Sequence, residues 1–249
     1  MALCVSVGER ALDGVLGALG RLRGEELAEV RIDLVSARGP HNDGVADGGA
    51  LAGLGEAEMA RVWAHPARKI ATCRDLGRRA GGVGFTAERR AELERAMASG
   101  GVAMVDIEFE APAAYREALR ACAAKHKVEV VISYHNYVET PVDLATIVDT
   151  CFARGASIAK VAVMAHSAAD SARVLAVYGS LASAERRVVA LAMGAPGMIT
   201  RVAALSLGAP FTFVALTEAS ATAPGQLTLD EMRQIKEGLR SSTVARCIE

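Results

Sequence analysis

The chain has 249 residues, of which 51% are hydrophobic and only 4% aromatic. A chain of this length suits one large α/β domain or two small ones, and the low aromatic content means that Ala, Val and Leu must do most of the packing. The formal net charge of −1 shows no basic excess, which argues against nucleic acid or an acidic membrane surface as a partner, and no uncharged apolar run is long enough to span a bilayer.

The cysteines and the first residues indicate a compartment. Five cysteines are scattered along the chain without a C-x-x-C pair: Cys4, Cys73, Cys122, Cys151 and Cys247. Such an odd, dispersed set argues against a disulfide framework or a zinc site and fits a reducing cytoplasm. The opening segment MALCVSVGER has no basic region and includes Glu9 and Arg10, so we expect no signal peptide there and a cytoplasmic location.

Short apolar segments alternate with longer amphipathic ones along the chain. The predicted strands are residues 2–7, 28–34, 69–73, 102–109, 128–134, 157–164, 187–193 and 211–216. Helical periodicity is found in residues 9–22, 86–99, 112–126, 143–155, 167–181 and 229–240. Thr86 and Ser167 are predicted to cap helix starts, and Gly100 and Gly155 lie where helices should end.

The chain contains eight strand–helix units of about 31 residues each. This number predicts the (β/α)8 barrel, a fold of the α/β class. We expect residues 1–249 to form a single catalytic domain of this type. The glycine-rich segments 37–55 and 77–84 are predicted to be loops at the end of the barrel where active sites are built. Residues 77–84 could also bind phosphate, but they lack the G-x-x-x-x-G-K-[ST] pattern.

Polar side chains recur near the C-terminal ends of the predicted strands. They are Ser6, Glu29, Arg31, Asp33, Arg74, Asp106, Glu108, Ser133, His135, Lys160 and Thr217. Some have a structural alternative, because Glu29, Arg31 and Asp33 alternate along one strand and could form a ladder of ion pairs. For Glu108 we favour a satisfied carboxylate at the barrel mouth, and His135 alone could be a packed, hydrogen-bonded histidine.

Lys160 is the hardest of these residues to explain structurally. It lies in the middle of SIAKVAVMA (157–165), whose composition is typical of a strand buried on both faces. Because a buried ammonium is costly to desolvate, the lysine could pair with Glu29 or Glu108 across the barrel. The chemical alternative is that an apolar, cation-lined pocket favours the neutral amine, which can form a Schiff base with a ketone.

The neighbouring polar residues extend the chemical interpretation. His135 could take a proton from the carbon beside the imine and return it to a leaving hydroxyl. Arg31, Arg74 and Arg201 indicate a substrate that carries a carboxylate. Together with Lys160, these residues predict elimination or aldol cleavage of an anionic keto compound.

Seven segments carry a family resemblance. They are EVRIDL (29–34), ATCR (71–74), VDIEF (105–109), VISYHNYVETP (131–141), AKVAVM (159–164), ALAMGAPGMITR (190–201) and TAPGQLTLDEMR (222–233). In order and spacing they resemble type I 3-dehydroquinate dehydratase, a lyase of the shikimate pathway. The resemblance implies a homodimer that converts 3-dehydroquinate to 3-dehydroshikimate without a metal or an organic cofactor.

The resemblance also implies a role for each matching position. Lys160 matches the lysine that forms a Schiff base at the substrate C3 ketone, and His135 matches the general acid and base acting at C2 and C1. The implied substrate-binding residues are Ser6, Glu29, Arg31, Arg74, Arg201, Thr222 and Gln226. Among these, Arg201 is the expected partner of the substrate carboxylate, and the loop TAPGQ (222–226) is expected to fold over the substrate.

The sequence departs from the family pattern beside the histidine. Family members often carry a glutamate shortly after the strand-three arginine, where it helps to orient the histidine, but RDLGRRAGG (74–82) contains none. Asp106 or Glu108 is the expected substitute. The common H-D-F is here H-N-Y at 135–137, and Thr222 replaces the serine of the loop.

Two other functions compete with the dehydratase. A class I aldolase acting on a keto acid or a sugar phosphate would also use a strand lysine, and the glycines of MGAPGMITR (193–201) could serve a phosphate. A catalytically silent barrel, serving as a binding protein or a scaffold, is the third interpretation. The presence of both Lys160 and His135 argues against it.

Overall fold

The computed structural model describes residues 2–35, 54–74, 84–180 and 185–241, and structural statements concern these residues. Most of the two predicted glycine-rich loops, 37–55 and 77–84, lies outside them, as does Cys247. No helix in the described ranges combines the length and apolarity needed to cross a bilayer.

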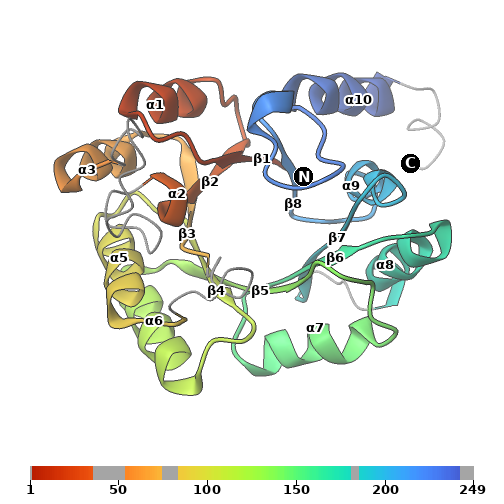
Figure 1. Ribbon diagram of the computed structural model, residues 1–249, viewed down its shortest axis with the longest axis horizontal. Helices are drawn as coiled ribbons and strands as arrows, with labels where there is room; N and C mark the ends of the chain where they lie inside the picture. Colours follow the sequence, from red (N-terminus) through yellow and green to blue (C-terminus); the bar gives the residue numbers. More distant parts are fainter. Residues whose placement is uncertain (1, 36–53, 75–83, 181–184, 242–249) are drawn as a thin grey trace, which may run out of the picture.

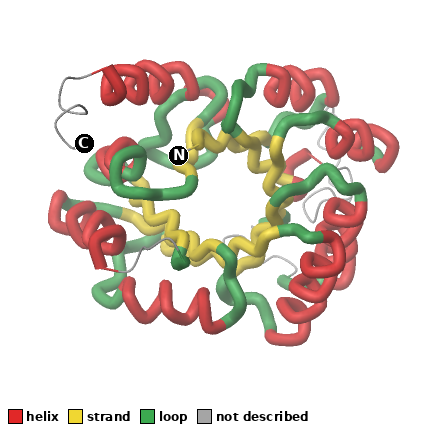
Figure 2. Tube along the Cα trace, turned by 180° about the vertical axis from the view of Figure 1, so that it is seen from behind, coloured by secondary structure: helices red, strands yellow, loops and turns green. Residues whose placement is uncertain are grey.

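The described residues form one sheet of eight parallel strands that curls into a nearly closed (β/α)8 barrel, as predicted. The strands are β1 Ala2–Val7, β2 Leu27–Arg31, β3 Arg68–Thr72, β4 Met104–Glu108, β5 Glu129–Asn136, β6 Ile158–Met164, β7 Arg187–Met193 and β8 Phe211–Val214. Each of β1 to β6 pairs with the next strand, and β8 pairs with β1. Figure 2 shows the resulting ring of strands inside an outer ring of helices.

The helices cover the outside of the barrel (Figure 1). They are α1 Leu12–Gly20, α2 Ile32–Val35, α3 Glu56–Ala64, α5 Ala87–Ala98, α6 Ala113–His126, α7 Leu144–Ala153, α8 Ala168–Ser180, α9 Met198–Ala203 and α10 Leu229–Ser241, with a 3-10 turn η1 at Glu218–Ser220. The predicted caps are confirmed: the Thr86 hydroxyl accepts a hydrogen bond from the Arg89 backbone N–H, and the Ser167 hydroxyl accepts one from that of Asp170. Gly100 and Gly155 end their helices with φ of +75° and +87°.

The structure corrects the end of the second predicted strand. β2 stops at Arg31, and the short helix α2 begins at Ile32, so Asp33 does not continue the strand alternation of Glu29 and Arg31. The Asp33 carboxylate instead binds the Arg31 guanidinium and accepts a hydrogen bond from the Arg74 backbone N–H. The ion pair between Arg31 and Asp33 that the ladder would contain is therefore present, although Asp33 lies on α2 and not on the strand. Helices α3 and α9 were not among the predicted helices.

The period of two along each strand separates the barrel interior from the helix layer. Five interior residues on neighbouring strands belong to one apolar cluster: Leu27, Ile70, Met104, Val131 and Ile158. The residues two positions further along the same strands are polar: Glu29, Thr72, Asp106, Ser133 and Lys160. Because all the strands are parallel, this switch gathers the polar side chains towards the C-terminal end of the barrel, above an apolar floor.

Candidate active site

Lys160 lies inside the barrel and is 4% exposed. Its Nζ donates hydrogen bonds to Glu29 Oε1 at 3.1 Å and to Asp106 Oδ2 at 3.2 Å, and it lies 4.1 Å from the centre of the Phe213 ring. The expectation of an apolar, cation-lined surrounding is therefore corrected, since two carboxylates contact the amine. Pairing with Glu29 is confirmed, and Asp106 takes the place proposed for Glu108.

The two carboxylates are themselves held by hydroxyl groups. Glu29 accepts hydrogen bonds from Ser6 Oγ at 3.1 Å and Thr72 Oγ1 at 3.2 Å, and Asp106 accepts one from Ser133 Oγ at 2.6 Å. Burial raises the pKa of Glu29, but the charges of the Lys160 and Arg74 side chains outweigh it and lower that pKa overall.

The pKa of Asp106 is set by the same two opposing effects, burial and neighbouring positive charges. Burial raises the pKa of its carboxyl, but the charges of Arg74 and Lys160 lower that pKa far below its usual value. Both Glu29 and Asp106 are therefore ionised at neutral pH, and both accept hydrogen bonds from Lys160 Nζ.

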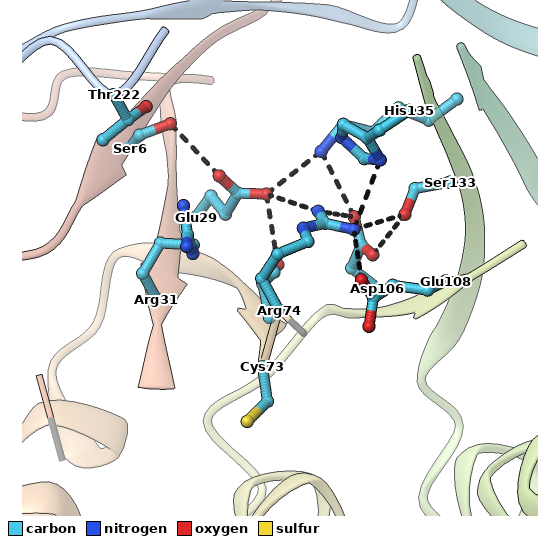
Figure 3. Close-up of polar contacts among 12 residues, drawn as sticks. Ser6, Glu29, Arg31, Cys73, Arg74, Asp106, Glu108, Ser133, His135 and Thr222 are labelled. Atoms are coloured by element: carbon cyan, nitrogen blue, oxygen red, sulfur yellow. Dashed lines mark hydrogen bonds and ion pairs between the residues drawn. The ribbon is translucent and has the colours of Figure 1, made fainter. Parts of the chain in front are cut away.

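Arg74 forms the centre of the polar network (Figure 3). Its Nη1 donates to Ser133 Oγ at 2.8 Å, and its Nη2 donates to Asp106 Oδ2 at 3.2 Å. The guanidinium also lies within 3.9 Å of Glu29 and 3.8 Å of Glu108. Burial lowers the pKa of Arg74, but these carboxylates raise it well above its ordinary value, so Arg74 is a fixed positive charge.

His135 lies against this arginine, as Figure 3 shows. Its Nδ1 is 3.4 Å from Arg74 Nη1, and its ring stacks on Tyr137 with centroids 6.0 Å apart. Burial, together with the charges of Arg74 and Lys160, lowers the pKa of His135 well below 6.5, although Asp106 acts in the opposite direction. The imidazole is therefore neutral at neutral pH, which is the state required of a general base.

Asp106 and Glu108, the two residues predicted to orient His135, both contact Arg74. Asp106 binds Ser133 and Arg74, of which Arg74 lies beside the histidine, and the Asp106 charge raises the pKa of His135. Glu108 Oε2 accepts a hydrogen bond from Arg89 Nη2 at 2.6 Å and its other oxygen lies near Arg74, which confirms a satisfied carboxylate at the barrel mouth.

The other two predicted arginines differ in their contacts. Arg31 binds Asp33 through two hydrogen bonds, from Nε at 2.9 Å and from Nη2 at 2.5 Å. Arg201, on α9, is 1% exposed, and its Nε and Nη2 have no hydrogen-bond partner in the described part of the chain. Burial lowers the pKa of Arg201 to about 10. Of the three arginines predicted to bind substrate, Arg201 is thus the one with buried N–H groups that no described residue accepts.

The loop of residues 221–228, which follows β8, contributes Thr222, Ala223 and Gln226 to the lining of the pocket around Lys160. Gln226 Oε1 accepts hydrogen bonds from the Thr222 backbone N–H at 2.9 Å and from its hydroxyl at 3.3 Å. Pro224 O accepts one from the Gly194 backbone N–H at 3.2 Å, just after β7. These contacts hold the loop against the β7–α9 turn.

All nine predicted site residues line one pocket at this end of the barrel. It is formed by Ser6, Glu29, Arg31, Arg74, His135, Tyr137, Lys160, Ala162, Leu191, Met193, Arg201, Phe213, Thr222, Ala223 and Gln226. The walls Ala162, Leu191 and Phe213 were missed, although the period of two places Ala162 on the same face as Lys160. Within the described ranges, no group of three or more His, Cys, Asp or Glu could hold a metal ion.

The chain as a whole matches a known family. The family model for type I 3-dehydroquinase matches residues 3–242. The chain belongs to the type I 3-dehydroquinase family. This membership makes it a hydro-lyase and contradicts the class I aldolase alternative.

Individual relatives of the type I 3-dehydroquinase family agree with this assignment. The 3-dehydroquinate dehydratase of Desulfotalea psychrophila is 30% identical over 235 residues, which cover 94% of this chain and 96% of that one. The enzyme of the same name from Shouchella clausii is 34% identical over 151 residues, covering 59% of this chain and 58% of that one.

Solved structures show the same fold. The 3-dehydroquinate dehydratase of Geobacillus kaustophilus aligns with a TM-score of 0.73 at 26% identity, covering 97% of this chain and 91% of that one. That of Aquifex aeolicus aligns with a TM-score of 0.72 at 23% identity, covering 97% of this chain and the whole of that one. A 3-hexulose-6-phosphate synthase, at 14% identity and a TM-score of 0.56 over 95% of this chain and 99% of that one, shares the fold alone.

Proposed function

We propose that Lys160 and His135 carry out the dehydration of 3-dehydroquinate to 3-dehydroshikimate that characterises the type I 3-dehydroquinase family. One observation carries the proposal: a buried amine and a neutral imidazole line the same pocket, and both contact a single network centred on Arg74 and Asp106. A neutral base beside an amine is the combination that Schiff-base elimination requires.

The first stage joins the substrate to Lys160. The ammonium loses a proton to a base, for which the neutral His135 ring is suited, and the amine attacks the C3 carbonyl carbon. The resulting carbinolamine loses its oxygen as water and leaves a protonated imine. Because the imine carries the positive charge that the ammonium carried, the carboxylates of Glu29 and Asp106 stabilise it electrostatically. The carboxylates beside Lys160 therefore favour the intermediate that the reaction must form.

The second stage is the elimination. The imine draws electrons from the adjacent carbon, so His135 can remove a proton from C2. The electron pair forms a carbon–carbon double bond towards C1 as the C1–oxygen bond breaks, and the protonated His135 donates its proton to the departing hydroxyl. Water then hydrolyses the imine, releasing 3-dehydroshikimate and restoring the amine.

Substrate recognition follows from the remaining polar residues of the pocket. We assign the substrate carboxylate to Arg201, because a buried guanidinium with unsatisfied donors favours a negative partner. The substrate hydroxyls are assigned to the remaining predicted binding residues, Ser6, Glu29, Arg31, Thr222 and Gln226. Arg74 lines the pocket as well, but its contacts with Ser133 and Asp106 favour a role in holding His135.

Trapping the imine tests this function. Incubation with 3-dehydroquinate and borohydride should reduce the imine to a stable secondary amine, and mass spectrometry should place the adduct on the Lys160 peptide. Lys69 is a built-in control, because it is also fully buried but donates to the His65 and Ala67 carbonyls, and its peptide should remain unmodified.

Two variants complete the trapping experiment. Lys160→Ala should form no adduct, while His135→Ala should form imine slowly and turn over at least about a hundredfold more slowly than the wild type. Full dehydratase activity in Lys160→Ala would refute the covalent route.

We further propose that the protein is a cytoplasmic homodimer in which residues 1–249 form one catalytic domain. The family resemblance supports the dimer. The cysteines within the described ranges, Cys4, Cys73, Cys122 and Cys151, are all unpaired, which supports a reducing compartment.

A further inference from the structure

Arg89 is an arginine on the buried face of an outer helix. It lies on α5 and is only 3% exposed, on the same helical stripe as Leu93 and Met97. It does not line the substrate pocket. A charge in such a position is costly to desolvate unless its contacts are specific.

The Arg89 guanidinium joins the ends of two neighbouring strands. Nη1 donates to Gly84 O at 2.7 Å, while Nη2 donates to Cys73 O at 2.5 Å and to Glu108 Oε2 at 2.6 Å. Cys73 immediately precedes Arg74, and Glu108 is the last residue of β4. Arg89 therefore fixes the backbone that carries Arg74 and a carboxylate that faces it.

Glu108 is connected to His135, the proposed base, through Arg74. Glu108 Oε1 lies 3.8 Å from Arg74 Nη1, and this same nitrogen donates to Ser133 and lies 3.4 Å from His135 Nδ1. Figure 3 shows the inner part of the series, with Glu108, Arg74 and His135 in succession. Opposite charges alternate from Arg89 to Arg74, so each group restrains the next.

We propose that Arg89 is a positioning residue for the reaction, acting through Glu108 and the Cys73 carbonyl to hold Arg74 against His135. The inference rests on the proposed role of His135 as the base. It depends on the planar fork of the guanidinium, which reaches three acceptors at once, whereas a lysine ammonium would offer the charge without that geometry.

The charged groups that face His135 are Arg74, Lys160, Asp106 and Arg31. If Arg89 is replaced, Glu108 acts more strongly on Arg74 and draws it away from the imidazole. The loss of that nearby positive charge raises the pKa of His135 towards 6.5. The acidic limb of kcat/KM, which reports the free enzyme, should then move to higher pH.

The test compares Arg89→Gln and Arg89→Lys with Arg95→Gln, a matched change at an exposed position of the same helix. We expect Arg89→Gln to lower kcat by about 10- to 100-fold with a smaller change in KM, and to shift the acidic limb upwards. Arg89→Lys should show a smaller shift in the same direction, because the lysine keeps the charge beside Glu108 but lacks the fork. Arg95→Gln should match the wild type in both respects.

A second change separates positioning from a general loss of stability. Adding Glu108→Gln to Arg89→Gln removes the carboxylate that displaces Arg74, so the double variant should regain part of kcat and of the wild-type pH profile. Wild-type kcat and pH dependence in Arg89→Gln, or losses that simply multiply in the double variant, would overturn the proposal. If Arg89→Gln does not fold, an unshifted pH profile in Arg89→Lys overturns it.

Failure of this inference is distinguishable from failure of the proposed function. Borohydride trapping on Lys160 in the wild type tests the function and does not depend on Arg89. A trapped adduct together with an unaltered Arg89→Gln variant would reject the positioning role alone.

Discussion

Arg201 combines two properties that usually exclude each other. Its side chain is almost completely buried, yet two of its nitrogens lack a hydrogen-bond partner within the described residues. Unpaired buried charge costs several kcal/mol in a folded protein, so it destabilises this part of the barrel. The same property makes the guanidinium a strong partner for a carboxylate that enters the pocket. We infer that Arg201 lowers the stability of the ligand-free chain and increases its affinity for a substrate carboxylate.

Arg201→Met should therefore change stability and binding in opposite directions. Without the buried charge, we expect the ligand-free melting temperature to rise by about 2 °C or more, which calorimetry would measure. Loss of the charged hydrogen bonds should raise KM by about 10- to 100-fold. As the control, Arg187→Met removes a half-exposed arginine paired with Glu129 and should leave KM unchanged. An unaltered KM in Arg201→Met would contradict the assignment of the carboxylate.

The sequence correctly predicted which polar residues of the apolar strands line the pocket. It was less successful in predicting which side chains those residues contact. Lys160 and His135 were predictable because polar residues interrupt apolar strands. The contact of Lys160 with Asp106 was not, because it depends on how β4, β5 and β6 are aligned across the barrel. Sequence reasoning therefore finds the candidate reacting groups more readily than the charges around them.

At the scale of elements, the alternation of strands and helices was readable from periodicity, while the ends of elements were less so. β2 ends at Arg31, and Asp33 on α2 accepts a hydrogen bond from the Arg74 backbone N–H, a contact between residues 41 positions apart that no local pattern reveals. Arg89 was missed as well, although a signal exists: it is a charged residue on the stripe of α5 that Leu93 and Met97 make apolar.

The loop of residues 221–228 depends on a glycine that makes a close contact. Gly225 has φ of +73°, and a Cβ there would lie 2.7 Å from the Gly194 carbonyl oxygen. Gly225→Ala should therefore push the loop from the β7–α9 turn and displace Thr222 and Gln226. We expect kcat/KM to fall by about tenfold or more, with a smaller change in the free energy of unfolding.

Gly208→Ala provides the matched control for Gly225→Ala. Gly208 also has positive φ, +86°, but a Cβ there would meet no atom within 4 Å. This substitution should cost about 1 kcal/mol of stability through backbone strain and leave kcat/KM unchanged. If both variants lose activity equally, backbone strain rather than the contact with Gly194 explains the result.

At the scale of the whole molecule, the barrel encloses a group of opposite charges above an apolar floor. The carboxylates of Glu29 and Asp106 and the cations of Lys160 and Arg74 are all buried and mutually paired. Each charge depends on the others, because removing one leaves a partner desolvated and unpaired. The charged network of the proposed active site is thus also a determinant of stability, and its contribution depends on pH.

The stability difference between the wild type and Lys160→Met should accordingly depend on pH. The pKa values of Glu29 and Asp106 lie below their ordinary 4.5 and 3.8 in the folded chain, so these groups stabilise the fold above about pH 4.5 and lose that contribution as the pH falls further. Without Lys160 their pKa values rise, so we expect the variant to be less stable by about 3 kcal/mol at pH 7 and the difference to shrink below pH 4.5. Urea unfolding at a series of pH values measures it. Lys125→Met, at an exposed position, should show a small difference at every pH, whereas a constant difference for Lys160→Met would mean that its ion pairs contribute no pH-dependent stability.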